Sequence, residues 1–355
     1  MTIANDQLPL TTAIGSLPHH NADAALEYSF KLGIPFLPQI PIRNPWEYMI
    51  AQALEGLPGL DVSRDGAVTL DADVWSGRAR RLNERLLGAL ENERAPGAFE
   101  GFEPASSTSS CWQPFLWECE ERGTRTAKIQ LAGPLTAQSA IRLKNGESLD
   151  LLPELTSQIY RLVLARSLAM TRRLVQVGIQ PLIFLDEPGL YGFSNQQPRQ
   201  VLALQELRLL VQTLKRDGAT VGLHCCSNTD WNAVLGLGLD FLSIDTELSL
   251  KPLLSGARNS LGQFLANGGR LSLGVIPTQR GEGPAAPVEP LRLLGEVKQA
   301  FTDLGGYSPE QARAILGQSL FTPACGLAFH TPSEAEDILE GLIEFQRLVR
   351  HDLQK

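Results

Sequence analysis

Two segments far apart in the chain carry side chains that bind soft metal ions. His224 and Cys226 lie in the segment Gly-Leu-His-Cys-Cys-Ser-Asn, and Cys325 lies much later, in Thr-Pro-Ala-Cys-Gly-Leu. Both segments follow runs that read as strands, and side chains alternate along a strand. His224 and Cys226 should therefore converge, while Cys225 points away. One imidazole and two thiolates form a zinc set that leaves a position for another ligand. The pattern predicts an enzyme that activates a ligand at zinc.

An acidic pair between these segments could complete the site. Asp245 comes first after the apolar run 241–244, which makes it the best fourth ligand, and Glu247 is the alternative on the same face. A carboxylate in this position also caps a following helix, so ligation and capping both stay open for Asp245. The remaining cysteines, Cys111 and Cys119, are expected to pack as small apolar side chains.

Two further polar motifs follow predicted strands. Asp186 and Glu187 form a carboxylate pair that could hold a substrate amine or shift each other's pKa, and they are the predicted catalytic residues. A helix cap and a surface charge are the simpler interpretation of this pair. Ile14, Gly15 and Ser16 are predicted to bind substrate together with Asp186. Their backbone N–H groups and hydroxyl could receive an anion, although a plain strand-to-helix turn is the alternative.

These motifs need a scaffold that gathers the ends of several strands. Apolar runs alternate with amphipathic helical patterns, which predicts parallel strands with crossover helices. The strand candidates are 11–14, 36–37, 127–131, 182–185, 220–223, 241–244, 271–274 and 319–321. The helical patterns cover 22–32, 151–177, 200–217, 231–236, 248–267, 290–304 and 333–348. Alternation of this kind over 355 residues predicts an α/β fold, a (β/α)8 TIM barrel with its chemistry at the carboxyl ends of the strands.

Residues 55–125 interrupt this alternation. Within them, residues 61–71 read as a hairpin and residues 82–92 as a helix. We expect a single domain over residues 1–355, in which 55–125 is an insertion between the second and third strands.

The composition excludes several classes of protein. A hydrophobic content of 43% and a charged content of 20% are typical of soluble globular proteins. The net charge of −8 argues against nucleic acid or an anionic membrane as a partner. No apolar run reaches the roughly 20 residues of a membrane span, and no secretory signal is recognisable. Five cysteines in a chain of this length do not form a disulfide framework, so we expect a reducing, cytoplasmic setting.

Five motifs also carry a family resemblance. Residues 12–18, 133–136, 185–188, 224–226 and 323–327 read Thr-Ala-Ile-Gly-Ser-Leu-Pro, Gly-Pro-Leu-Thr, Leu-Asp-Glu-Pro, His-Cys-Cys and Pro-Ala-Cys-Gly-Leu. Together they resemble the catalytic C-terminal barrel of cobalamin-independent methionine synthase, within the superfamily that also contains uroporphyrinogen decarboxylase.

The resemblance implies a zinc-dependent methyltransferase that activates a thiol, homocysteine, and forms methionine. It implies zinc ligands at His224, Cys226 and Cys325. It also implies that Asp186 holds the substrate amino group, while the Ile14–Ser16 motif holds the carboxylate. The methyl donor would be a folate or a corrinoid, either methylcobalamin or a corrinoid protein.

Four departures from the family pattern bear on the zinc ligands, on the binding of the substrate amine and on the methyl donor. Asp245 stands where the family has a glutamate ligand, and residues 39–42 supply no carboxylate before the Arg-Asn pair. Ala140 stands where a tryptophan beside the folate is expected, and Gln279 or a neighbour replaces a loop histidine. The departures at Ala140 and Gln279 favour a corrinoid donor. Two other functions stay open, namely a metal-free decarboxylase of the uroporphyrinogen type and a non-catalytic relative that binds zinc or thiols.

Overall fold

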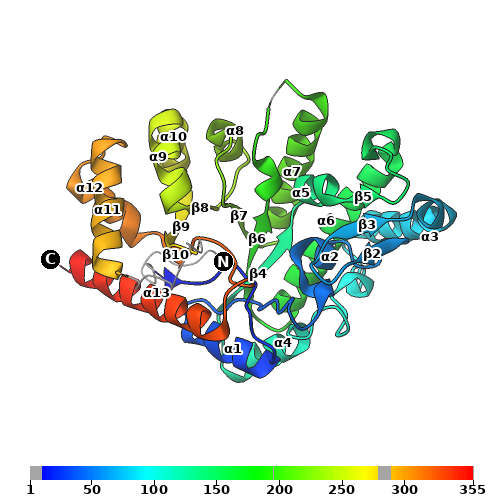
Figure 1. Ribbon diagram of the computed structural model, residues 1–355, viewed down its shortest axis with the longest axis horizontal. Coiled ribbons are helices and arrows are strands. Elements are labelled where there is room, and N and C mark those ends of the chain that lie inside the picture. Colours follow the sequence, from blue (N-terminus) through cyan, green and yellow to red (C-terminus); the bar gives the residue numbers. More distant parts are fainter. Residues whose placement is uncertain (1–9, 195, 279–288, 355) are drawn as a thin grey trace.

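A curled sheet of seven parallel strands forms the centre of the protein, and helices cover its outer face (Figure 1). The computed structural model describes residues 10–194, 196–278 and 289–354. In spatial order the strands are β1 (Leu10–Thr11), β10 (Leu320–Pro323), β9 (Arg270–Ile276), β8 (Phe241–Asp245), β7 (Thr220–Cys225), β6 (Gln180–Asp186) and β4 (Thr126–Ala132). The parallel sheet that strand–helix alternation predicts is therefore present.

Along the chain, one or more helices follow most strands of the main sheet. They are α1 (Ala22–Lys31), α2 (Met49–Ala53), α3 (Ala72–Glu91), α4 (Trp112–Glu121), α5 (Pro134–Ala140), α6 (Pro153–Gln176), α7 (Pro198–Arg216), α8 (Trp231–Leu235), α9 (Thr246–Gly256), α10 (Arg258–Ala266), α11 (Pro290–Asp303), α12 (Pro309–Gly317) and α13 (Pro332–Leu353). Short 3₁₀ turns are η2 (Pro45–Glu47), η3 (Glu100–Phe102), η4 (Leu149–Leu151) and η5 (Pro188–Leu190). Among the helices of the described residues, none combines the length and the apolar character needed to cross a membrane.

The central strands are buried on both faces, which requires nearly continuous apolar sequence. In β6, Leu182 and Phe184 belong to a small apolar cluster with Phe241 of β8. The alternate residues Ile183 and Leu185 belong to the larger core that includes the helices. The polar side chains of the site lie at the carboxyl ends of these strands, above the small cluster.

The predicted closed barrel is only partly present. The described strands form a curled half-barrel of seven strands, because the run expected as the second strand makes only isolated bridges. That segment nevertheless hydrogen bonds on both sides. The Ile34 N–H donates to the Thr11 carbonyl at 2.8 Å, and the Leu37 N–H donates to the Lys128 carbonyl at 2.8 Å. Residues 34–37 thus lie between β1 and β4 without forming a regular strand.

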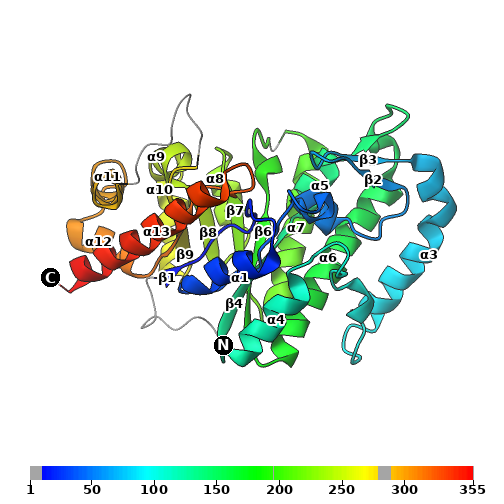
Figure 2. The ribbon, with the colours of Figure 1, turned by 60° about the horizontal axis from the view of Figure 1, so that its bottom comes forward.

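The segment 55–125 contains a hairpin, the long helix α3 and, nearer the main sheet, helix α4. Strands β2 (Leu60–Val62) and β3 (Val68–Leu70) are antiparallel, as the hairpin prediction requires, and β3 also pairs with β5 (Arg142–Leu143). The helix predicted at 82–92 begins earlier, because the Asp71 side chain caps it by accepting from two backbone N–H groups. Figures 1 and 2 both place α3 and this hairpin at the end of the molecule opposite the end of α13.

One helix prediction needs correction, and four helices were not predicted. The single helix expected over 248–267 is two helices, α9 and α10, because the chain leaves helical geometry at Ala257. Helices α2, α4, α5 and α12 were not predicted, although the start of α12 carries a readable signal. Ser308 accepts a hydrogen bond from the Gln311 N–H, and the Gln311 side chain accepts one from the Ser308 N–H, which is a capping box.

Candidate metal centre at the carboxyl ends of the strands

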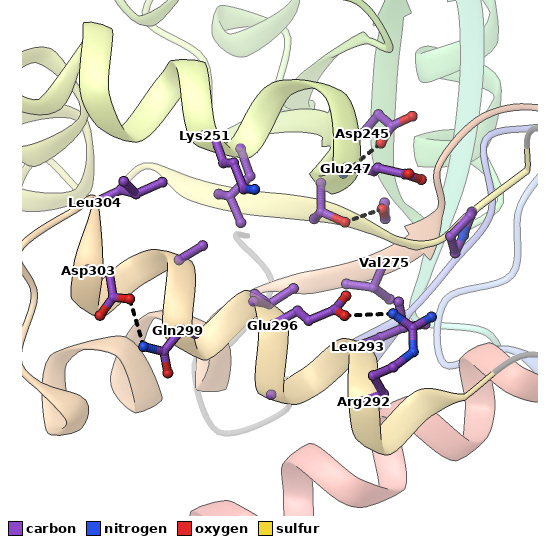
Figure 3. Close-up of a pocket in the computed structure, with 17 residues that line it drawn as sticks. Asp245, Glu247, Lys251, Val275, Arg292, Leu293, Glu296, Gln299, Asp303 and Leu304 are labelled. Atoms are coloured by element: carbon purple, nitrogen blue, oxygen red, sulfur yellow. Dashed lines mark hydrogen bonds and ion pairs between the residues drawn. The ribbon is translucent and has the colours of Figure 1, made fainter.

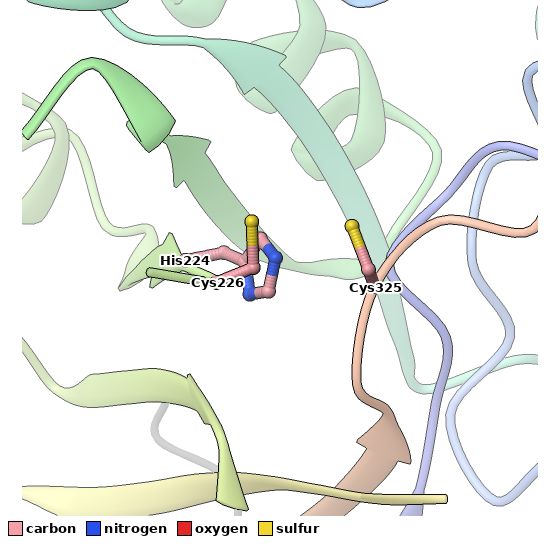
Figure 4. Close-up of side chains that lie close together, drawn as sticks. All are labelled: His224, Cys226 and Cys325. Atoms are coloured by element: carbon pink, nitrogen blue, oxygen red, sulfur yellow. The ribbon is translucent and has the colours of Figure 1, made fainter. Parts of the chain in front are cut away.

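Three predicted ligands meet at one edge of the sheet. One ligand atom each from His224, Cys226 and Cys325 lies within 4.8 Å of the other two, and within the described residues this is the group suited to a metal. Figure 4 shows Cys325, on the loop after β10, opposite the other two. Strands β8 and β9 lie between β7 and β10, so a flat sheet would separate the strand ends by about 14 Å. The curl of the sheet therefore assembles the group.

The alternation of side chains along β7 decides which cysteine joins the group. The Cys225 side chain is fully buried away from it, and its thiol donates to the Ser227 carbonyl at 3.2 Å. His224 and Cys226 point the other way. The parity argument made from the sequence gives the side on which each of these three residues lies.

His224 has one occupied and one free ring nitrogen. Its Nδ1 lies 3.0 Å from the Ser243 hydroxyl oxygen on the neighbouring strand. Its Nε2 is buried and has no hydrogen-bond partner in the described part of the chain. A metal-binding imidazole is commonly held through its second nitrogen in this way, with the first nitrogen free to ligate. The residues present therefore fit a zinc ion.

The two thiols are electrostatically different. Cys325 accepts a hydrogen bond from the Cys226 thiol and lies beside the His224 ring, and these contacts lower the pKa of Cys325 to about 4. The same hydrogen bond, together with burial, raises the pKa of Cys226. Both shifts follow from the closeness of the two thiols, and loss of one proton from the pair gives a thiolate, which is the form that binds metals.

The acidic pair after β8, Asp245 and Glu247, does not join the group of three ligand atoms. Asp245 caps α9, since its Oδ1 accepts from the Glu247 N–H at 2.8 Å and from the Leu248 N–H at 3.1 Å. No carboxylate of the described residues joins the group of three ligand atoms, and Glu247 is exposed. The capping role that the sequence left open is the one observed. Metal ligation by Asp245 or Glu247 stays a prediction.

Asp186 ends β6 beside His224, to which it is paired in register. Its carboxylate is 5% exposed, and its Oδ1 has no partner among the described residues. Burial raises the pKa of Asp186 to about 6, an effect that His224 and the Lys128 ammonium oppose. A buried carboxylate oxygen without a donor is suited to receive one from a bound molecule.

Glu187, the second predicted catalytic residue, is held by the protein itself. Its side chain is fully buried. Oε1 accepts from the Leu135 N–H at 3.1 Å, and Oε2 accepts from the Thr136 N–H at 2.7 Å and from the Thr136 hydroxyl at 2.5 Å. Both oxygens therefore anchor the start of α5. Burial raises the pKa of Glu187 to about 7, and these hydrogen bonds oppose the rise.

The Ile14–Ser16 turn packs against the loop that carries Cys325. The Leu327 N–H donates to the Ser16 carbonyl at 2.9 Å, and the Ser16 Oγ would lie 2.1 Å from a Cβ atom placed on Gly326. Only glycine allows this approach, which brings the turn next to the metal ligands. The structure therefore brings this predicted substrate-binding motif to the same rim.

Sequence reasoning missed Lys128 and Gln130, which lie on β4 below this turn. Both side chains are buried, and the Lys128 Nζ donates to the Gln130 Oε1 at 3.0 Å. Burial lowers the pKa of Lys128 to about 8, and the Asp186 carboxylate opposes the shift. A signal was present, because polar residues two apart inside a largely apolar strand share one face of it.

A cavity of about 1010 Å³ lies between α9 and α11, and none of the three ligands lines it (Figure 3). Asp245 and Glu247 line it at one end, and Arg292 pairs there with Glu296. No lining side chain of this cavity has a buried polar atom without a partner. The orphaned atoms of His224 and Asp186 mark the strand-end rim, not this cavity, as the candidate site.

Comparisons with known proteins give one kind of match. No family model matches the chain, and no curated protein matches it. Among solved structures, it is similar to a B12-independent methionine synthase from Shewanella sp. W3-18-1 in complex with selenomethionine. The identity is 15%, the match covers 68% of this chain and 67% of that chain, and the TM-score is 0.45. A similarity at this level does not show membership of a family.

Proposed function

We propose that this protein is a zinc-dependent methyltransferase that acts on a thiol, with homocysteine as the substrate and a corrinoid or a folate as the methyl donor. One observation carries the proposal. His224, Cys226 and Cys325 place their ligand atoms within 4.8 Å of one another, and the buried Nε2 of His224 has no hydrogen-bond partner among the described residues.

The three side chains would hold the metal. Zinc bound in this way lowers the pKa of a thiol that joins it, so that the sulfur is a nucleophile at neutral pH. Ser243 keeps the His224 ring in place through Nδ1. The partly exposed Cys226 and Cys325 leave the centre open to a small molecule from the barrel mouth.

The remaining groups of the rim suit an amino acid. The Asp186 Oδ1 is buried and has no donor within the described residues, so it would accept from the substrate ammonium. The Ile14–Ser16 turn lies against the Cys325 loop, where its amide groups and hydroxyl would receive the carboxylate. A thiol amino acid would thus have separate partners for its sulfur, amine and carboxylate.

The two other functions are weaker. A metal-free decarboxylase has no use for an imidazole and two thiols whose ligand atoms converge. A non-catalytic protein would bind zinc and the thiol without transferring a methyl group. Metal content separates the first alternative from the proposal, and product formation separates the second.

The decisive experiment is a metal analysis of the purified protein and three matched variants. Wild-type protein should contain about one zinc per chain. Cys226→Ser and Cys325→Ser should lose most of it, because each removes a thiolate ligand. Cys225→Ser is the control and should keep its zinc, because that thiol faces Ser227. Wild-type protein without zinc, or equal loss in all three variants, would refute the proposed centre. Methionine formed from homocysteine and methylcobalamin or methylfolate then tests the reaction.

A further inference from the structure

A buried ammonium lies beneath the candidate site and has no assigned role. Lys128 is 1% exposed, on the inner side of β4. Its Nζ donates to the Ile14 carbonyl at 2.7 Å and to the Gln130 Oε1 at 3.0 Å. Burial of a charged amine is unfavourable unless the amine is paired and hydrogen bonded. The acceptor on Ile14 belongs to the turn that is expected to bind substrate, so this contact connects Lys128 to the site.

The contact fixes the direction of one amide group. The Ile14 carbonyl and the Gly15 N–H belong to the same planar peptide, and in a trans peptide these groups point in opposite directions. A carbonyl held by Lys128 therefore turns the Gly15 N–H away from the ammonium. Gly15 has a φ of 150°, a conformation that other residues rarely adopt.

Gln130, on the same strand, packs against Gly15 and restricts the conformation of the turn. Its Nε2 donates to the Leu37 carbonyl at 2.8 Å, and a Cβ atom on Gly15 would lie 2.4 Å from that nitrogen. The Gly15 carbonyl in turn accepts from the Gln39 N–H at 3.0 Å. The Ile14–Gly15 peptide is thus held by the Lys128 side chain of β4, and the Gly15–Ser16 peptide that follows it is held by the segment after α1, so that this part of the turn cannot rotate freely.

The charges of Lys128 and Asp186 also suit an amino-acid substrate. The Lys128 ammonium and the Asp186 carboxylate attract each other across the interior of the half-barrel without direct contact. Near a bound amino acid they provide one positive and one negative group on the protein. Asp186 is the complement of an ammonium, and the amide that Lys128 orients is the complement of a carboxylate.

We propose that Lys128 is a positioning residue for the carboxylate of the thiol substrate, which it serves by holding the Ile14–Gly15 peptide with its N–H toward that carboxylate. The inference rests on the proposed function, because it requires a thiol that binds at the metal centre. It adds a specificity determinant, namely a preference for thiols that carry a carboxylate.

The first test uses the unmodified zinc-loaded protein. Ile14-Gly15 is the only Ile-Gly pair in the sequence. Labelling isoleucine carbonyls with ¹³C and glycine nitrogens with ¹⁵N therefore gives a single correlated amide signal, that of Gly15. We expect 4-sulfanylbutanoate, which has no amine, to shift this signal. We expect 3-aminopropane-1-thiol, which has no carboxylate, to leave it in place while it binds. A shift with the aminothiol alone, or with neither bound thiol, would overturn the inference.

The second test compares Lys128→Met with Ser272→Ala. Ser272 is a matched control, since it is buried on β9 and its hydroxyl has no partner among the described residues. In calorimetric titrations, Lys128→Met should weaken homocysteine and 4-sulfanylbutanoate about tenfold, as loss of an oriented hydrogen bond to a charged group predicts. Binding of 3-aminopropane-1-thiol should change less than about twofold, as it should for every thiol with Ser272→Ala.

The outcomes separate this inference from the function on which it rests. Equal weakening of all three thiols in Lys128→Met would make Lys128 a purely structural residue and overturn the inference alone. Absence of binding by any thiol to zinc-loaded wild-type protein would overturn the proposed function and the inference together. If Lys128→Met does not fold, the signal of Gly15 in the unmodified protein still decides.

Discussion

Replacement of Glu187 tests whether this residue acts on substrate or holds the scaffold. The carboxylate is fully buried and accepts three hydrogen bonds from Leu135 and Thr136 at the start of α5. In Glu187→Ala these donors lose their acceptor, and each buried unsatisfied group costs roughly 1–3 kcal/mol. Because such losses are not fully additive, we expect the free energy of unfolding to fall by about 4 kcal/mol.

Glu187→Gln is the conservative companion. Its amide keeps one acceptor oxygen but turns an NH₂ group toward donors, so we expect a smaller loss of about 2 kcal/mol. Thr136→Val removes the hydroxyl that donates to Glu187 and accepts from the Gly189 N–H at 2.9 Å. Its cost should be smaller in the Glu187→Ala background, because the two residues share one contact.

Urea unfolding gives these free energies, and zinc content and thiol affinity are measured on the same samples. A structural role predicts that Glu187→Gln keeps its zinc and binds homocysteine with nearly unchanged affinity below the unfolding transition. Two results would refute the reasoning. One is a stability of Glu187→Ala within about 1 kcal/mol of wild type. The other is a loss of homocysteine binding by Glu187→Gln at unchanged stability, which would make Glu187 a substrate contact.

Three further predictions follow from the site. Asp186→Asn should weaken homocysteine about tenfold and 4-sulfanylbutanoate hardly at all, because only the first has an ammonium; equal weakening in titrations would contradict this role. Burial raises the pKa of Cys111 and of Cys119 to about 12. Mass spectrometry after iodoacetamide treatment at pH 8 should therefore find both unmodified in folded protein and modified in urea; labelling of either without urea would show that its thiol is accessible. Methylcobalamin, free or on a corrinoid protein, should give methionine faster than polyglutamyl methylfolate, because a cobalt leaving group needs no proton donor; faster turnover with the folate would reverse this assignment.

The position of Gln279, one of the departures that favour the corrinoid, lies outside the described residues. Ala140, another departure, ends α5, the helix whose start Glu187 anchors. The donor prediction therefore depends on the sequence pattern at both positions, and the comparison of the two donors is its direct test.

Local sequence determined the elements and the side on which their residues lie. Period-two alternation placed His224 on one face of β7 and Cys225 on the other, because successive side chains of any strand point to opposite sides. Largely apolar runs predicted the parallel strands, since strands buried on both faces consist mostly of apolar residues. The alternation of side chains and the position of the strands depend on residues close together in the chain, so they can be predicted from the sequence.

Tertiary structure decided which of these residues meet. Cys325 reaches His224 only because the sheet curls past two intervening strands, and the sum of strand twists that produces the curl is written in no single segment. The sequence allows Asp245 either to cap a helix or to bind a metal, and in the structure its Oδ1 accepts a hydrogen bond from the first turn of α9. Lys128 contacts Ile14, which lies 114 residues earlier in the chain. Such contacts depend on how distant segments pack, which residue type and spacing along the chain do not specify.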